Sequence, residues 1–335
     1  MKTTELSLLN ANTLELHYWF KDESHTMDAF IQNKCEYEVL AILKELSSVF
    51  NVEITIETEP FAEGGFLRWF KIDSIDKTII TTIKVAILTA LLTAIFITPI
   101  SSSIGKASEL LIEKIFEDKE LKEIEKELKE LKKEELLLKI EKLRQEINYK
   151  SQLLNENNLI KKRRSNFYEA LEKYPKVEKL SLFVENENKN QLTAETVIVK
   201  KDFKEYILTS DNIDPQEIEE AIIEIISPVL KKGNYKWTGI FNGESLAFDM
   251  KSNEFKTLVQ SGEIEFKNGS SINCGLIIKK KIDNEGVERI VGYEVLRVNN
   301  YFENDKPIET PEGRFHRQKK ASEKDQLSLF NDQLN

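Results

Sequence analysis

The residues best suited to chemistry in this chain lie close together, where a predicted strand ends and a predicted helix begins. They are Asp22, Glu23, His25 and Asp28. Loops at strand ends are favoured positions for sites, and a histidine beside carboxylates can act as a general base or a metal ligand. The same residues also suit a helix N-terminus, where Asp28 would cap the helix and negative charge is stabilising. An enzyme with its site at His25 and Asp28 is one hypothesis for function, and helix capping is the alternative.

The rest of the chain carries no recognisable catalytic pattern. Glu63-Gly64-Gly65 lacks the longer glycine pattern and the following Lys and Ser of a phosphate-binding loop. No nucleophile elbow, zinc-protease or deaminase pattern occurs. Cys35 and Cys274 stand far apart and outside any ligand spacing, so neither a disulfide nor a zinc site is expected. We predict a protein without its own catalysis, metal or cofactor, in a reducing compartment.

Composition limits the partners. The chain has 335 residues, 40% of them hydrophobic, which is enough for two modest domains and a connector. Its formal net charge of -10 disfavours adhesion to nucleic acid over the whole surface, so no direct nucleic-acid binding is predicted. The first twenty residues have no apolar core of signal-peptide length, so secretion is not expected.

One stretch, residues 85 to 105, contains no charged residue although 32% of the chain is charged. Extended back to residue 79 it predicts a helix of about 20 apolar residues, the length that crosses a bilayer, with Lys84 near one end. Pro99 ends this helix. A membrane-contacting helix and a core helix of a soluble protein both fit. Small residues at steps of four form a predicted packing stripe, Thr82, Ala86, Ala90, Ala94 and Thr98.

The patterns predict an α+β protein in five parts. Residues 1–76 form a small β-α-β module, with strands at 13–20 and 52–58 and a helix at 28–50. The apolar, transmembrane-type helix and its hinge occupy 77–105. A long charged helix covers 106–165, a C-terminal antiparallel β-rich domain covers 166–302, and a disordered tail covers 303–335.

The charged helix has a narrow apolar face. Its residues follow two heptad registers with a shift between them, Leu121, Ile124, Leu128 and Leu131, then Leu136, Ile140, Leu143 and Ile147. This face predicts a coiled coil through which the chain forms a homo-oligomer. A single helix lying against its own domains, or an antiparallel hairpin, is the alternative. Basic residues 161–164 are expected to close the helix, where positive charge complements the macrodipole.

The C-terminal domain is predicted to be a small antiparallel sheet or partly open barrel with one packed helix. That helix is placed at 214–229, where Asp214 would be the cap, Pro215 the first residue and Glu217 the capping-box partner. Strands are expected at 180–184, 196–200, 237–240, 245–248, 264–266, 272–279 and 287–298. Asn242-Gly243 and Asn268-Gly269 are turn signals between them.

Near the end of the tail, Gln326-Leu327-Ser328-Leu329-Phe330 is an apolar island in a charged segment. Such islands dock in grooves through two or three anchors. The pentapeptide resembles the peptide by which bacterial polymerases and repair proteins bind the sliding clamp. The resemblance covers these residues only, with Gln326, Leu327, Leu329 and Phe330 at matching positions. It implies that Leu329 and Phe330 fill an apolar pocket and that Gln326 fixes the orientation.

These observations give two further hypotheses for function. The main one is a bacterial, membrane-associated, self-assembling binding protein at the inner membrane with most of the chain cytoplasmic, in the manner of a stress or phage-defence effector. Its partners are the lipid bilayer and further copies of itself. The second is a soluble replication or repair adaptor that docks on the sliding clamp. An ordinary span with a cytosolic N-terminus would place Phe330 on the wrong side of the membrane for the clamp.

Overall fold

Two sheets, each with its own hydrophobic core, organise the chain in the computed structural model. The structure describes residues 7–22, 26–58, 66–127, 130–231, 233–267, 269–303 and 306–331. Unit 1 consists of Met1–Ser210 with Asn284–Val287, and unit 2 of Asp211–Asp283 with Glu288–Asn335.

Unit 1 contains a five-stranded antiparallel sheet in the order β2-β3-β1-β4-β5. Its strands are β1 (Thr13–Phe20), β2 (Ile54–Thr58), β3 (Phe66–Ser74), β4 (Val177–Glu185) and β5 (Thr196–Val199). The succession β1-α1-β2-β3-α6-β4, with β1 and β3 in the centre, is a split β-α-β arrangement. Helices α2 to α5 are inserted between β3 and α6, and β5 extends one edge.

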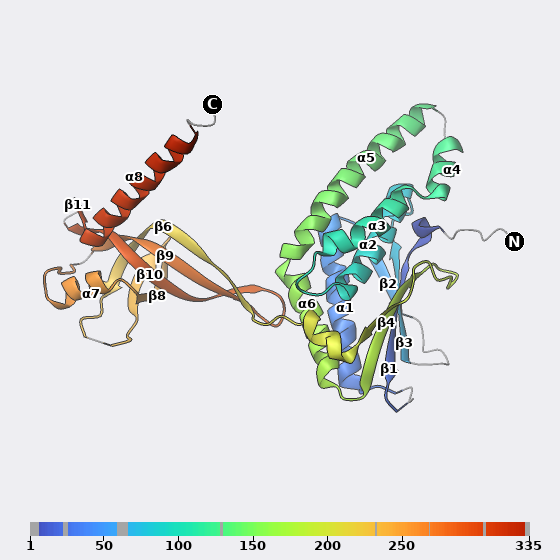
Figure 1. The fold of residues 1–335 in the computed structure, drawn as a ribbon, viewed down its shortest axis with the longest axis horizontal. Coiled ribbons are helices and arrows are strands. Elements are labelled where there is room, and N and C mark those ends of the chain that lie inside the picture. The colour runs from blue at the N-terminus through green and yellow to red at the C-terminus, as the bar shows by residue number, and fades with distance from the viewer. Residues whose placement is uncertain are drawn as a thin grey trace. The chain divides into compact units, whose positions relative to one another are not determined.

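The helices of unit 1 cover one side of this sheet, except α4, which lies beyond one end of it (Figure 1). They are α1 (Ala29–Phe50), α2 (Ile79–Ile97), α3 (Ile104–Phe116), α4 (Lys119–Glu127), α5 (Glu130–Leu153) and α6 (Asn158–Lys173), with the short 3-10 helices η1 (Leu8–Asn10), η2 (Leu154–Glu156) and η3 (Lys200–Tyr206). Leu14, Leu16 and Tyr18 of β1 point to the helices and join a single core with them. The predicted strand at 13–20, helix at 28–50 and strand at 52–58 are confirmed.

Helix α2 is the centre of this core. Within the described residues it is the one helix long and apolar enough to cross a membrane, yet 72% of its most apolar window is buried inside the protein. It packs against α1, α3 and α6 and against strands β1, β3 and β4. A helix that is apolar on all sides needs apolar neighbours on all sides. Here the surrounding elements of unit 1 supply them.

The prediction of one long helix over 106–165 is wrong, because this segment forms four helices. Asp118 separates α3 from α4, and its carboxylate accepts hydrogen bonds from Ser7 Oγ at 2.8 Å and from Leu9 N at 3.3 Å. Asn157 begins α6 by accepting from Ile160 N at 3.0 Å. Helix α3 packs against α5, so the apolar face of α5 is used within unit 1.

Unit 2 is a small barrel. Its elements are β6 (Asn212–Ser227), β7 (Trp237–Phe241), β8 (Glu244–Met250), α7 (Asn253–Gln260), β9 (Ser271–Ile282), β10 (Glu288–Glu303), β11 (Lys306–Glu309) and α8 (Pro311–Asn331). The strand order β10-β8-β7-β6-β9 closes on itself because β9 also pairs with β10. Strands β8 and β10 run parallel, and the other neighbours run antiparallel. The barrel encloses an apolar core built around Trp237, Phe248 and Phe255.

The predicted helix at 214–229 is wrong, because this segment is strand β6. Ala221, Ile223 and Ile225 are buried and alternate with Ile222 and Ile226, which are more than half exposed. Isoleucine is β-branched and favours strands, and the buried positions repeat every second residue. The packed helix of the barrel is α7 instead, between β8 and β9.

The structure also divides the C-terminal half differently from the predicted 166–302 domain. The predicted pairing of strands near 180–184 and 196–200 is confirmed as β4 with β5, but β4 also pairs with β1 and so belongs to unit 1. Of the other expected strands, 264–266 is not one. The Asn242-Gly243 turn joins β7 to β8 with φ values of 51° and 83°. The segment predicted to be a disordered tail contains β11 and α8.

Candidate functional site

The described part of the proposed site at residues 22–28 leads into the start of helix α1. His25 and Glu23 lie outside the described residues. The Asp28 carboxylate accepts hydrogen bonds from Phe30 N at 2.9 Å and Ile31 N at 3.1 Å, so it caps α1. No group of three or more His, Cys, Asp or Glu among the described residues is placed to hold a metal ion. The capping alternative therefore accounts for Asp28.

The small-residue stripe of α2 lies in the core. Ala86 and Ala94 are fully buried, Ala90 and Thr98 are nearly so, and Thr82 is half-buried. The charge of Lys84 is also used inside unit 1, because its Nζ donates to the carbonyls of Phe50 and Asn51, both at 3.1 Å, at the end of α1. Small side chains let neighbouring elements approach α2 closely.

The carbonyls at the C-terminal end of α2 are capped by side chains from α6 and η3. Arg164 Nη1 donates to Ile95 O at 3.2 Å and to Thr98 O at 2.7 Å. Tyr168 Oη donates to Phe96 O at 2.6 Å, and Tyr206 Oη donates to Ile97 O at 3.3 Å. These carbonyls have no partner within the helix, and three side chains satisfy them here.

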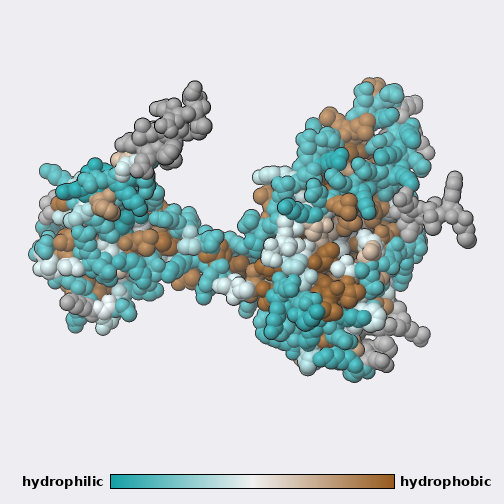
Figure 2. Space-filling model, viewed as in Figure 1, coloured by the Kyte–Doolittle hydropathy of each residue, from teal (hydrophilic) through white to brown (hydrophobic). Residues whose placement is uncertain are grey.

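The heptad face of the predicted coiled coil divides into two parts. Leu136, Ile140, Leu143 and Ile147 are buried, as is Leu121. Leu131 is 84% exposed, Ile124 is partly exposed, and Leu128 lies outside the described residues. Leu137 and Leu138 of α5 are also exposed. Hydrophobic side chains are visible on the surface near the end of α5 that follows α4 (Figure 2).

The basic cluster at 161–164 lies at the beginning of α6 and not at a helix C-terminus as predicted. Lys162, Arg163 and Arg164 are all more than nine-tenths buried. Positive charge near a helix N-terminus opposes the macrodipole, so this placement requires other compensation. The sequence carries a signal for it, because Arg164 falls on the apolar face formed by Ile160, Phe167 and Leu171.

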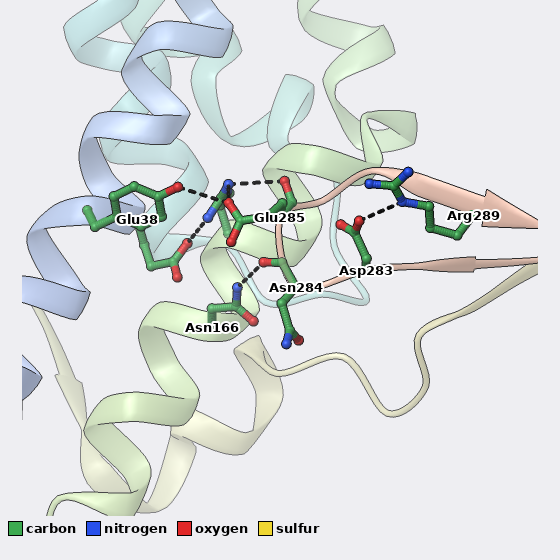
Figure 3. A network of polar contacts seen from close by, with 8 residues as sticks. Glu38, Asn166, Asp283, Asn284, Glu285 and Arg289 are labelled. Atoms are coloured by element: carbon green, nitrogen blue, oxygen red, sulfur yellow. Dashed lines mark hydrogen bonds and ion pairs between the residues drawn. The ribbon is translucent and has the colours of Figure 1, made fainter.

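Arg163 is compensated by two carboxylates. Its Nη1 lies 3.2 Å from Glu38 Oε2, and its Nη2 lies 2.6 Å from Glu285 Oε2. Tyr37 Oη donates to the same Glu285 oxygen at 2.9 Å, and Asn166 Nδ2 donates to Asn284 O at 3.0 Å (Figure 3). Burial raises the pKa of Glu38, and the Arg163 charge acts in the opposite direction. The ion pair between Arg163 and Glu38 is therefore buried within unit 1.

Arg164 is compensated differently. It is 2% exposed, and burial lowers the pKa of its guanidinium to about 10. None of the described carboxylates forms an ion pair with it, and its Nε is buried without a hydrogen-bond partner. The two carbonyls of α2 offer only partial negative charge.

On the opposite face of the unit 1 sheet, Glu15 is a buried carboxyl group. Trp69 Nε1 donates to Glu15 Oε2 at 2.8 Å. Burial raises the pKa of Glu15 to about 7, and the nearby Glu185 acts in the same direction. Glu15 and His17 lie on the side of β1 away from the helices, and both are buried. This group therefore changes its charge near neutral pH, which strand alternation alone does not reveal.

Unit 2 contains a hollow of about 300 Å³ beside the loop from β6 to β7. Its lining includes Tyr235, Lys231, Lys251 and Lys256, together with Asp249. Tyr235 is 64% exposed, and Lys251 Nζ lies 3.2 Å from Glu294 Oε1. An exposed aromatic ring among lysines suits a ligand with flat rings and negative charge. The predicted features did not include these residues, because only the barrel brings them together.

The predicted docking peptide continues α8. The helix spans Pro311–Asn331 and so includes Gln326, Leu327, Leu329 and Phe330, whose side chains lie outside the described residues. The start of α8 is tied to the barrel, since Ser252 Oγ and Val298 N donate to Glu312 Oε2 at 2.6 Å and 3.2 Å. Comparison of the chain with protein-family models, curated proteins and solved structures finds no match.

Proposed function

We propose that this protein is an adaptor without catalysis of its own that docks on the bacterial sliding clamp through Gln326-Leu327-Ser328-Leu329-Phe330. The observation that carries the proposal is this pentapeptide, which has Gln, Leu, Leu and Phe at the positions of the clamp-binding peptide. Leu329 and Phe330 are the apolar anchors, and Gln326 supplies the orienting amide. The peptide belongs to the last turns of α8, so any rearrangement of these turns on the clamp would cost free energy and keep the affinity modest.

The surroundings of α2 support this proposal. Clamp docking takes place in the cytosol, and a membrane span in the middle of the chain would complicate it. Helix α2 finds apolar neighbours, partners for its C-terminal carbonyls and a use for Lys84 within unit 1. A helix satisfied in this way does not need lipid.

The barrel of unit 2 is the part that the tail would bring to the clamp. Strands β6, β7, β8, β9 and β10 follow the connectivity of an OB-type barrel. The third strand, β8, pairs in parallel with the fifth, β10, and helix α7 lies between the third and the fourth. By fold-level analogy, such barrels bind oligonucleotides through their second and third strands and the adjoining loops. Tyr235 and Lys231 belong to the loop between the first two strands, and Lys251 and Lys256 line the same hollow from the segment after the third strand. Single-stranded nucleic acid is therefore the proposed ligand, in contrast to the expectation drawn from whole-chain charge.

Clamp docking has a direct test. Full-length protein is titrated onto immobilised bacterial sliding clamp, and Leu329→Ala or Phe330→Ala is expected to weaken binding at least about tenfold, because buried anchors carry most of such an interface. Leu334→Ala, just beyond the motif, is the control and should bind as the unchanged chain does. Unaltered affinity of the Leu329→Ala, Phe330→Ala double variant would remove the proposal.

The barrel ligand is tested by fluorescence anisotropy with a labelled oligothymidine of about twelve nucleotides. Tyr235→Ala is expected to weaken binding about fivefold to a hundredfold, since one base-stacking contact contributes roughly 1–3 kcal/mol. Tyr149→Ala is the matched control, because Tyr149 is 66% exposed on α5 of unit 1. An equal loss in both variants, or no binding by the unchanged chain, would exclude the barrel as the binding module.

A membrane-associated, self-assembling effector is the second candidate. Two observations favour it: α2 has the length and apolarity of a membrane span, and α5 exposes Leu131 and Leu138. In this candidate α2 would leave the core to enter lipid, and the exposed leucines would join copies of the chain. The cost of exposing the core that α2 covers is the argument against it.

A further inference from the structure

A second hollow, in unit 1, gathers donors that suit a phosphate group. It measures about 300 Å³ and lies between the segment that joins α2 to α3 and the start of α6. Its polar lining consists of Ser101, Ser102, Ser103, Asn155, Lys161 and Arg164, together with one carboxylate, Glu156. The chain's predicted functional residues include none of these.

Arg164 is the first observation that points to a ligand. Its side chain is 98% buried and lines the hollow, but only its Nη1 has hydrogen-bond partners. Its Nε is buried and unpartnered, and its Nη2 donates to no group that the structure describes. A buried charge is costly unless a counter-charge or a full set of hydrogen bonds accompanies it. An anion in the hollow would supply a counter-charge and an acceptor for Nη2, whereas Nε has no accessible surface and stays out of its reach.

The hydroxyl of Ser103 is the second observation that points to a ligand. Its Oγ accepts hydrogen bonds from Asn155 Nδ2 at 2.9 Å and from Lys106 N at 3.4 Å. A hydroxyl that accepts two hydrogen bonds still has its own hydrogen to donate. No acceptor for that hydrogen is found among the described residues, so the hydroxyl is available as a donor to a ligand.

Helix α3, which begins at this hollow, also favours an anion. Ser103 is the N-cap of α3, a helix of 13 residues, so the positive end of the helix dipole lies at the hollow. The N–H groups of Ile104 and Lys106 already donate to Asn155 Oδ1 at 2.8 Å and to Ser103 Oγ at 3.4 Å. Lys161 Nζ lies 3.6 Å from Glu156 Oε2, and this glutamate side chain is 83% exposed. Such a solvated pair is weak, so Lys161 can turn to an anion instead.

We propose that this hollow binds the phosphate monoester group of a small compound. A guanidinium, an ammonium, serine hydroxyls and a helix N-terminus together offer more donors than a carboxylate can accept, and their spread suits a tetrahedral anion. The volume is at the lower end for small-molecule pockets, about 300 Å³, which leaves room for a short organic group on the phosphate. The site is independent of the clamp peptide and of the barrel, so it stands or falls separately.

The test is isothermal titration calorimetry on the full chain with inorganic phosphate and with glycerol 3-phosphate, against sodium chloride at equal ionic strength. We expect saturable binding of the phosphate compounds only. Lys161→Glu is expected to lower the affinity at least about tenfold, because it replaces an attractive ammonium group with a carboxylate that repels the phosphate. Lys173→Glu, at the far end of the same helix, is the control and should leave the affinity unchanged.

Arg164→Gln is expected to abolish binding, but it also removes two hydrogen bonds that cap α2. Lys161→Glu is therefore the deciding variant, because Lys161 caps nothing. Flotation with phosphatidic acid vesicles, compared with neutral vesicles, distinguishes a lipid phosphate from a soluble one. Binding to either phosphate source that is lost in Lys161→Glu supports the site and identifies the source. Absence of binding to both sources, or equal affinity of Lys161→Glu and the unchanged chain, overturns it.

Discussion

Leu91→Ala is expected to lower the free energy of unfolding by about 2–5 kcal/mol, the range for truncating a fully buried leucine. Leu91 is 0% exposed in the middle of α2, where strands and helices surround it. Urea unfolding followed by circular dichroism measures the change. Leu138→Ala is the matched control, because Leu138 is 57% exposed on α5, and it should change stability by no more than about 0.5 kcal/mol.

The same variant separates the two candidate functions. If α2 were sheltered by lipid, truncating Leu91 would leave the stability of the detergent-free protein unchanged and would reduce liposome flotation instead. We expect the opposite result, with a large loss of stability and no flotation of the unchanged chain. Flotation of the intact protein together with an unaltered urea midpoint for Leu91→Ala would contradict the core position of α2.

Arg163→Met is expected to cost about 3–5 kcal/mol, because it leaves the Glu38 carboxylate buried without its partner. Glu38 is 3% exposed, and its ion pair with Arg163 is the buried part of the network (Figure 3). Arg289→Met is the control. Arg289 pairs with Asp283 at 2.9 Å, but its side chain is 67% exposed, so its removal should cost no more than about 1 kcal/mol.

The direction of the pH dependence follows from Glu38. Burial raises its pKa even with Arg163 present, and loss of the arginine raises it further. A carboxyl group whose pKa is raised on folding stabilises the folded state at low pH, and this contribution is lost as pH rises through the folded-state pKa. The Arg163→Met variant should therefore lose more stability at pH 8 than at pH 4.5. Glu38→Gln in the same chain should restore much of it, and a double variant no more stable than Arg163→Met would show that Glu38 is not the cause.

Local patterns in the N-terminal part were sufficient to predict several elements. Strand β1 alternates between Leu14, Leu16 and Tyr18 on one side and polar residues on the other, and α1 begins at a residue that can cap a helix. These features depend on residues close together in the sequence. A spacing of two residues marks a strand, and spacings of three and four residues mark a helix. The partners of β1 in the sheet, β3 and β4, are not recorded in this way, because β4 lies more than 150 residues along the chain.

Strand β6 and the basic cluster show why other expectations failed. Ile218, Ile222, Ile225, Ile226 and Val229 fit a helical stripe, whereas Ile223 and Ile225 fit the alternation of a strand. Pairing with β7 and β9 decided for the strand. Lysines and arginines at 161–164 are most simply placed in solvent, but tertiary contacts bury Arg163 against Glu38 and Arg164 against the end of α2. Each hollow is likewise lined by segments that are distant in the sequence, and these segments meet only in the folded unit.

The sequence by itself determined that residues 79 to 97 avoid water, that the chain carries no familiar catalytic pattern, and that its last segment holds a clamp-like peptide. These are properties of residue types and short spacings. Only the tertiary structure decided what shelters the apolar helix, because hydrophobicity is non-directional and lipid or protein can satisfy it equally. Hydrogen bonds are directional, and those from Arg164, Tyr168 and Tyr206 to the end of α2 place that helix within the protein's own core.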